Sequence, residues 1–218
     1  MRRYRPLIWG VAVAALLFGG FWELAEDFAY STAVLRFDTE VSAAIQSLRS
    51  PALTVVMYVI TFLGGTVVVS VAVGVIFGLL WRRGRRFDAV YAGVVVIVGA
   101  VLSTFMKGLF DRPRPPIENA IITLPESFSF PSGHTMGSLC LAWVLGLIVV
   151  TSTSLPRERK PWLLLPVVLY PVLVGTSRVY LGVHWPSDVL ASWLLAGAWV
   201  ALATGSAVAL MHSEWKTR

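Results

Sequence analysis

The sequence has few charged residues and few of the residue types that staple secreted domains together or hold metal ions. Only 14% of its 218 residues are charged, and it contains one cysteine and three histidines. The single cysteine, Cys140, has no partner for a disulfide within the chain, and it lies inside an apolar run where it would pack as a small apolar residue. The sequence also lacks internal repeats and low-complexity tracts. A disulfide framework and a repeat array are therefore excluded.

Apolar residues make up 56% of the chain, and its mean hydropathy is strongly positive. This composition predicts an integral membrane protein rather than one or two soluble domains. The net charge of +6 could indicate nucleic-acid binding, but the Lys and Arg residues stand in short clusters between apolar runs. Membrane topology and anionic lipid headgroups explain such clusters better, so we expect membrane lipids and no nucleic acid as partners.

Six apolar runs approach the ~20 residues that a helix needs to cross a bilayer. We therefore predict an all-α, polytopic membrane protein with six transmembrane helices, in a single membrane-embedded domain covering residues 1–218. No small-x-small cleavage site follows the first run, so we expect it to be retained, and the short fifth run should extend toward Tyr180. The six runs are Leu7 to Leu24, Leu53 to Trp81, Ala89 to Phe110, Gly133 to Val150, Trp162 to Gly175 and Val189 to Met211.

The distribution of Lys and Arg predicts that both termini are cytoplasmic. In that orientation twelve of the eighteen basic residues lie on the inner side, as the positive-inside rule favours. We accordingly expect a multi-pass protein of the cell membrane. The inner residues are Arg2, Arg3, Arg5, Arg82, Arg83, Arg85, Arg86, Arg157, Arg159, Lys160, Lys216 and Arg218, and the outer ones are Arg36, Arg49, Lys107, Arg112, Arg114 and Arg178.

Residues 38–48, between the first two runs, have apolar residues at helical spacing. Val41, Ala44, Ile45 and Leu48 would share one face of a helix, and Asp38 could cap its start. The pattern predicts either an interfacial helix on the outer leaflet or an ordinary packed helix within a loop.

Three polar clusters, Lys107 to Pro115, Pro131 to His134 and Ser177 to Asp188, lie at ends of the apolar runs. Ionisable groups beside a bilayer core are costly and are therefore functional candidates. Counted through six spans, all three clusters reach the same face, which is the extracytoplasmic face in the orientation above. Inverting the topology would move them together, so their convergence does not depend on which face is outside.

The clusters contain the side chains that a phosphate site needs. Lys107, Arg114 and Arg178 are three cations without a matching group of acids, and they suit a tetrahedral oxyanion. Ser132 and Gly133 begin the fourth run, where free backbone N–H groups and the Ser hydroxyl could bind the same anion.

Two histidines and a carboxylate suggest how a phosphate would react there. Asp188 follows His184 by four residues, so it could accept a hydrogen bond from one imidazole nitrogen and leave the other free to attack phosphorus. His134 would then protonate the leaving alcohol and later activate water. Each residue also has a structural explanation, because basic residues anchor span ends, a lone histidine is often structural and Asp188 could cap a helix; only together do they indicate catalysis.

We expect neither a metal ion nor another cofactor at this site. A two-metal site needs several converging carboxylates, and Asp188 is the only acid in the clusters that contain histidine. Asp111 and Arg112 are interpreted as loop residues that pair with each other, and His212 as a surface residue at the opposite face.

The order and spacing of the motifs resemble those of the type 2 phosphatidic acid phosphatase superfamily, in its membrane lipid phosphatase branch. The resemblance covers about residues 53–211. The motifs are Lys107, six residues and Arg114-Pro115; Pro131-Ser132-Gly133-His134; and Ser177-Arg178, five residues, His184, three residues and Asp188.

The resemblance implies magnesium-independent hydrolysis of a lipid phosphate. His184 would be the nucleophile, Asp188 its partner and His134 the acid. Bacterial members act on phosphatidylglycerol phosphate, phosphatidic acid or undecaprenyl diphosphate. The phosphate-binding residues would be Lys107, Arg114, Arg178, Ser132 and Gly133.

Three other activities remain open from the sequence. A carrier or flippase could use the cations only to hold a lipid phosphate, and an oxidase related to vanadate-binding enzymes would share the anion site. A phosphotransferase could pass a phosphohistidine to an alcohol instead of water. The sequence indicates neither the lipid nor the oligomeric state.

Overall fold

The structure is a computed structural model that describes residues 4–214, except for the side chains at 28–30 and 212–214. The prediction for His212, and the parts that Arg2, Arg3, Lys216 and Arg218 play in the predicted orientation, lie outside the described residues. The regular structure of the described chain is all helical, and the longest connection, residues 111–132 between α5 and α6, contains only the short helix η2. Its helices are α1 (Arg5–Tyr30), α2 (Thr32–Ser47), α3 (Pro51–Leu63), α4 (Thr66–Arg82), α5 (Arg86–Phe110), η2 (Ile117–Asn119), α6 (Gly133–Thr151), η3 (Arg157–Arg159), α7 (Lys160–Tyr180) and α8 (Pro186–Glu214).

Five described helical segments are long and apolar enough to cross a membrane: α1, α5, α6, α7 together with η3, and α8. A sixth span results if α2 and α3, which meet at an angle of 120°, are counted as one bent span. The all-helical, multi-pass fold is thus confirmed at the level of five to six candidate spans, and the fifth run does extend to Tyr180. A single domain over residues 1–218 stays a prediction.

The predicted second span, Leu53 to Trp81, is wrong as a single helix. It is divided into α3, which ends at Leu63, and α4, which begins at Thr66. Gly64 and Gly65 lie between them, and a Cβ at Gly64 would collide with the side chain of Val174 on α7. The glycines therefore permit a close approach of α3 to α7 at the point where the helix is interrupted.

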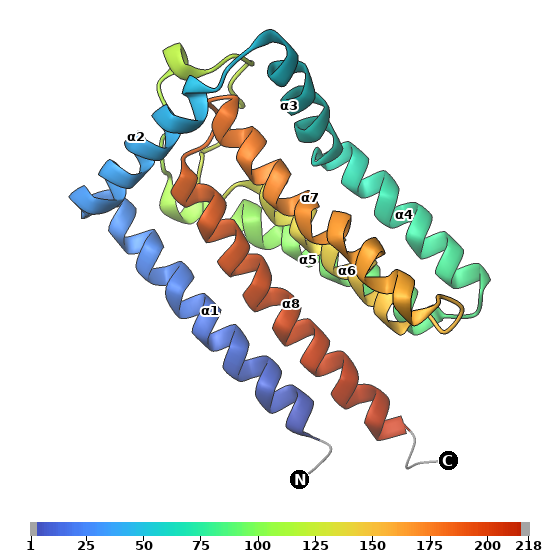
Figure 1. Ribbon diagram of the computed structural model, residues 1–218. Coiled ribbons are helices and arrows are strands. Elements are labelled where there is room, and N and C mark those ends of the chain that lie inside the picture. Colours follow the sequence, from blue (N-terminus) through green and yellow to red (C-terminus); the bar gives the residue numbers. More distant parts are fainter. Residues whose placement is uncertain (1–3, 215–218) are drawn as a thin grey trace.

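The helices form one bundle in which α1 lies along α8 and α6 along α7 (Figure 1). Close packing of α1 on α8 depends on glycine, because a Cβ at Gly10 would lie 2.8 Å from the carbonyl oxygen of Ala201. Cys140 is free and fully buried among apolar neighbours such as Val95 and Met136, as predicted. The start of α1 and the end of α8 lie at the same end of the bundle (Figure 1).

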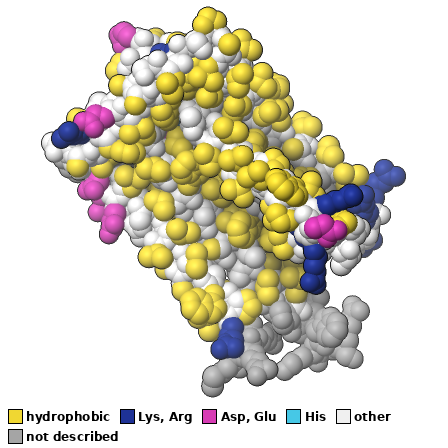
Figure 2. Space-filling view, in the orientation of Figure 1, with side chains coloured by type: hydrophobic (Ala, Val, Ile, Leu, Met, Phe, Trp, Pro, Cys, Tyr) yellow, Lys and Arg dark blue, Asp and Glu magenta, His cyan; other side chains and the backbone are white. Residues whose placement is uncertain are grey.

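Hydrophobic side chains cover much of the flank of the bundle, and Lys and Arg gather toward one end (Figure 2). The exposed arginines of this end lie where α4 ends, α5 begins and η3 precedes α7. The three polar motifs lie at the opposite ends of α5, α6, α7 and α8. The exposed arginines at the basic end are Arg82, Arg83, Arg86, Arg157 and Arg159.

Candidate active site

The three sequence motifs meet at one end of the bundle. Lys107 lies in the last turn of α5, Ser132, Gly133 and His134 lie at the start of α6, and Arg178 lies in the last turn of α7. Lys107, Arg114 and Arg178 each interact electrostatically with both His134 and His184. The predicted convergence of three cations and two histidines is therefore present.

His184 and Asp188 are hydrogen-bonded, and both are buried. The Nδ1 atom of His184 lies 3.2 Å from Oδ2 of Asp188, and the backbone N–H of Trp185 donates to the same oxygen at 2.9 Å. Because a carboxylate only accepts, the proton of a neutral imidazole belongs on Nδ1 and the lone pair on Nε2. The hydrogen bond from Trp185, the residue before α8, to Asp188 in the first turn of α8 also caps this helix. The structural explanation of Asp188 therefore holds alongside the catalytic one.

The surroundings of His184 favour its neutral form. Burial lowers the pKa of His184 well below its usual value of 6.5, and the cations Arg178, Arg114 and Lys107, followed by His134, lower this pKa further. The Nη1 atom of Arg114 lies 3.3 Å from Nε2 of His184. The nitrogen with the free lone pair is thus turned toward a cation.

Backbone carbonyls hold two of the three cations in place. Nζ of Lys107 donates to the carbonyl oxygen of Phe128 at 2.6 Å. Arg114 donates to the carbonyl oxygens of Ser127 at 2.8 Å and Val183 at 2.7 Å, and burial lowers its pKa. The loop between α5 and α6 therefore wraps around the cations and orients them.

Arg178 retains an unused donor. Its Nη1 donates to Oγ1 of Thr61 on α3 at 2.7 Å, whereas its buried Nε has no hydrogen-bond partner among the described residues. Ser103 Oγ is likewise buried without a partner in the described chain, and it would lie 3.5 Å from a Cβ placed on Gly133. Buried donors of this kind usually have a partner, and a bound oxyanion would provide one.

Sequence reasoning missed Thr61 and Ser103. Ser103 could have been found, because it precedes Lys107 by one helical turn and so shares its face of α5. No spacing links Thr61 to Arg178, which lies 117 residues later.

The start of α6 lies against both α8 and the interruption between α3 and α4. Ser132 is fully buried; its Oγ accepts from Thr135, and its carbonyl oxygen accepts from Ser192 of α8 at 3.1 Å. The Nε2 atom of His134 would lie 3.8 Å from a Cβ on Gly65. The helix interruption that the sequence did not predict is therefore part of the wall beside His134.

Two predictions about nearby charged residues are wrong. Arg112 does not pair with Asp111; it is buried, and it donates to Asp188 and to Asp38, each at 2.6 Å. Asp38 does not cap a helix, because α2 begins at Thr32 after the N-cap Ser31, and Asp38 is fully buried in its middle. Asp111 is exposed and ends α5 in a left-handed conformation.

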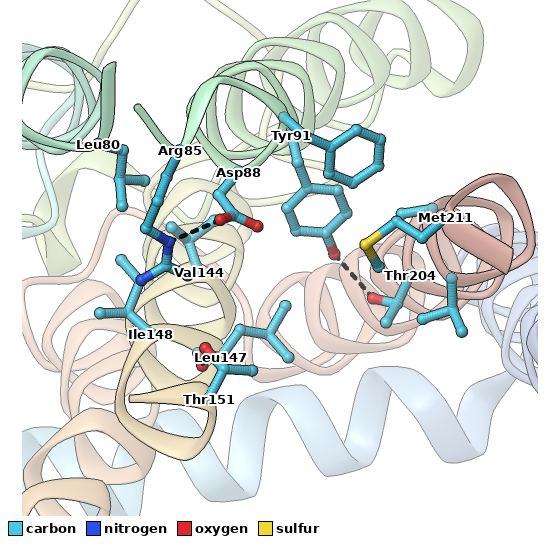
Figure 3. Close-up of a pocket in the computed structure, with 13 residues that line it drawn as sticks. Leu80, Arg85, Asp88, Tyr91, Val144, Leu147, Ile148, Thr151, Thr204 and Met211 are labelled. Atoms are coloured by element: carbon cyan, nitrogen blue, oxygen red, sulfur yellow. Dashed lines mark hydrogen bonds and ion pairs between the residues drawn. The ribbon is translucent and has the colours of Figure 1, made fainter. Parts of the chain in front are cut away.

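Within residues 4–214, apart from the side chains left undescribed, no group of three or more His, Cys, Asp or Glu residues is arranged to hold a metal ion. A separate pocket lies at the other ends of α5, α6 and α8 (Figure 3). It contains the Arg85–Asp88 ion pair at 2.7 Å and a hydrogen bond between Tyr91 and Thr204 at 2.7 Å. None of the motif residues lines this pocket.

The fold and the residue cluster define a multi-pass membrane protein in which cations, histidines and a helix N-terminus gather at the ends of the helices. Residues 88–211 match the PAP2 superfamily, which is more than half of the chain. The chain belongs to this family, whose members are metal-independent lipid phosphate hydrolases, and it is a membrane lipid phosphatase.

Two curated relatives and one solved structure illustrate the similarity. Phosphatidylglycerophosphatase B of Bacillus subtilis is 31% identical over 166 residues, covering 76% of this chain and 81% of that protein. An undecaprenyl-diphosphatase of the same organism is 33% identical, over 58% of this chain and 63% of its own. The crystal structure of a PAP2-type phosphatidylglycerolphosphate phosphatase from Bacillus subtilis superimposes with a TM-score of 0.77 and 30% identity, covering 92% of this chain and 96% of that one.

Proposed function

We propose that the protein hydrolyses the phosphate headgroup of a membrane lipid at the extracytoplasmic face, through a phosphohistidine on His184. The observation that carries this proposal is the hydrogen bond from His184 Nδ1 to Asp188, with Nε2 turned toward Arg114. A nitrogen nucleophile, an orienting carboxylate and a cation for the attacked phosphate are thus adjacent.

In the first step, the lone pair of His184 Nε2 attacks phosphorus and the bond from phosphorus to the lipid oxygen breaks. His134, in its protonated form, gives its proton to this leaving oxygen, so the lipid departs as an alcohol or, from a diphosphate, as a monophosphate. Lys107, Arg114 and Arg178, with the Ser132 hydroxyl and the backbone N–H group of Gly133, stabilise the charge on the equatorial oxygens. The backbone N–H of Ser132 donates instead to the carbonyl oxygen of Asp188 at 3.4 Å.

In the second step, water attacks the phosphohistidine, and His134 takes a proton from that water. The bond between phosphorus and Nε2 breaks, inorganic phosphate leaves and both histidines return to their starting protonation states. Asp188 keeps the proton of His184 on Nδ1 throughout, so that Nε2 remains the reacting atom.

Phosphatidylglycerol phosphate, phosphatidic acid and undecaprenyl diphosphate are the substrates we propose to test. The curated relatives act on lipids of two of these kinds, as their names state. The face of the membrane is proposed from the basic residues at the opposite end of the bundle, which favour a cytoplasmic location for that end and for both termini.

The test uses purified protein in detergent with EDTA, assayed for phosphate release from each of the three lipids. We expect release from at least one of them, and we expect His184→Ala to reduce it by about 10⁴-fold or more. Undiminished turnover by the variant would overturn the mechanism. Consumption of the lipid with transfer of phosphate to an added alcohol, and no free phosphate, would instead indicate a phosphotransferase.

A further inference from the structure

Asp188 is held on the side away from His184 by residues that the three motifs do not specify: Arg112 is one of the six residues between Lys107 and Arg114, and Asp38 lies outside the motifs altogether. Nη1 of Arg112 donates to Oδ1 of Asp188 at 2.6 Å, and Nη2 of the same guanidinium donates to Oδ2 of Asp38 at 2.6 Å. Asp38 and Asp188 are fully buried, and Arg112 is 5% exposed. One guanidinium therefore bridges two buried carboxylates, one of which orients the proposed nucleophile.

Ser187 fixes the far end of this bridge. Its backbone N–H donates to Oδ1 of Asp38 at 2.8 Å, and its hydroxyl donates to Oδ2 of Asp38 at 2.6 Å. Nη1 of Arg112 also donates to the Ser187 oxygen at 2.7 Å. Asp38 thus accepts three hydrogen bonds from two residues, and each of these residues is either bonded or adjacent to Asp188.

The arrangement restricts Asp188 in both position and rotation. One of its oxygens accepts from Arg112, and the other accepts from Trp185 and His184. Planar Arg offers two parallel donor groups at a fixed separation, which a Lys ammonium does not reproduce. A small rotation of Asp188 would move the imidazole of His184 out of line with the phosphorus atom, and misplacement of a nucleophile by about 1 Å costs on the order of 10²-fold in rate.

We propose that Asp38 and Arg112 are positioning residues that hold Asp188, and through it His184, in the reactive orientation. This inference rests on the proposed roles of His184 and Asp188. It assigns α2 to the active site, although α2 lies outside residues 88–211, the segment that matches the family.

Asp38→Asn tests the bridge with minimal change in shape. The amide has one acceptor oxygen in place of two, so it cannot replace all three hydrogen bonds. With its oxygen at the Oδ2 position, its NH₂ group opposes the backbone N–H of Ser187; with its oxygen at Oδ1, the NH₂ group opposes Arg112 and the Ser187 hydroxyl. Arg112→Lys is the second variant, because it keeps the positive charge but loses the two guanidinium NH₂ groups that bridge Asp188 and Asp38. Glu40→Gln is the matched control: it removes a carboxylate from the same helix, but one that is 62% exposed and forms an ion pair with Arg36.

The readouts are kcat for dioctanoyl phosphatidic acid, or whichever of the three lipids is turned over, and the inhibition constants of phosphate and vanadate. Vanadate becomes five-coordinate by accepting the lone pair of Nε2, so it reports the orientation of His184, whereas phosphate reports the cations. We expect Asp38→Asn and Arg112→Lys to lower kcat by about 10- to 100-fold, as loss of an outer-shell partner usually does. Vanadate inhibition should weaken by about 10-fold and phosphate inhibition by less than about twofold, with Glu40→Gln unchanged.

Inhibition constants do not depend on how much of the protein is folded, so a purely structural role would leave both of them unchanged. Unchanged vanadate inhibition would overturn the proposal, and so would an equal weakening for both inhibitors, which would indicate damage to the cations. Failure to recover inhibitor-binding protein from both variants would mean that the bridge serves folding, and would also overturn it. Failure of the proposed function is separate, because it shows as turnover by His184→Ala.

Discussion

At the scale of single residues, the proposed mechanism requires that His184 be unprotonated when it attacks phosphorus. Its Nδ1 proton is directed at Asp188, and its Nε2 is available only while the imidazole is neutral. Burial and the neighbouring cations lower the pKa of His184, so the neutral form persists at pH values below 6.5. The cations that we propose bind phosphate therefore also keep the proposed nucleophile unprotonated before phosphate arrives.

This dual role predicts a pH effect at Arg114. Replacing Arg114 with Gln removes a cation near His184, so the pKa of His184 rises and protonation inactivates the enzyme at a higher pH. The acidic limb of kcat/KM should move upward by about 1 pH unit in Arg114→Gln. Arg114→Lys keeps the charge and should retain the wild-type limb although its kcat/KM falls. Coinciding limbs for wild type and Arg114→Gln would show that Arg114 does not control this titration.

The motif residues could be predicted from the sequence because spacing alone brings His184 next to Asp188 and puts both on the same face as His134 and the cations. The residues that hold them could not be predicted in this way. Asp38 is separated from Ser187 by 149 positions, and its burial results from how α2 packs against the start of α8. Arg112 directly follows Asp111 in the sequence, but Asp111 is exposed whereas Arg112 is buried. Arg112 therefore pairs with the buried carboxylates of Asp38 and Asp188.

At the scale of elements, the interruption between α3 and α4 shapes one wall of the site. Irregular backbone at membrane depth is tolerated where it is buried in protein or lines a polar cavity, and Gly64 and Gly65 meet this condition beside Val174 and His134. Thr61, in the last turn of α3, reaches Arg178 from this position. This interruption could not be predicted from the apolar run Leu53 to Trp81, because two glycines in a hydrophobic run do not by themselves end a helix.

We predict that Thr61 sets the affinity for phosphate rather than the rate of the chemical step. Thr61→Val keeps the size of the side chain but removes the acceptor for Arg178, so this guanidinium loses its fixed orientation. The inhibition constant for phosphate should weaken by about 10-fold, equivalent to about 1.4 kcal/mol, with kcat changed much less. Thr61→Ser restores the hydroxyl and should behave like wild type. Equal inhibition constants for the Val and Ser variants would mean that Thr61 does not orient Arg178.

At the scale of the whole molecule, a cluster of exposed arginines and the polar motifs occupy opposite ends of the bundle. Arg82, Arg83 and Arg157 lie at one end, and Lys107 and Arg178 at the other. Composition was sufficient to predict a multi-pass helical protein, because apolar runs of this length have few other structures available in lipid. The convergence of the motifs followed from counting spans, although the run predicted as the second span is divided into α3 and α4.

The proposed orientation predicts which loops an impermeant reagent reaches in intact cells. Glu118 is exposed at the motif end and Thr153 at the basic end, whereas Cys140 is buried and should not react. A membrane-impermeant maleimide should label Glu118→Cys and leave Thr153→Cys unlabelled until the cells are permeabilised. The reverse pattern would place the site on the cytoplasmic face and leave its chemistry unchanged.

Detection of the covalent intermediate tests the central claim most directly. The enzyme is mixed with a lipid substrate carrying ³²P in its terminal phosphate and quenched in alkali, where a phosphohistidine survives. The account predicts label bound to the protein in the peptide that contains His184, none in His184→Ala, and discharge of the label as inorganic phosphate when turnover is allowed to continue. Phosphate release at the wild-type rate by His184→Ala, or label bound to another residue, would contradict it.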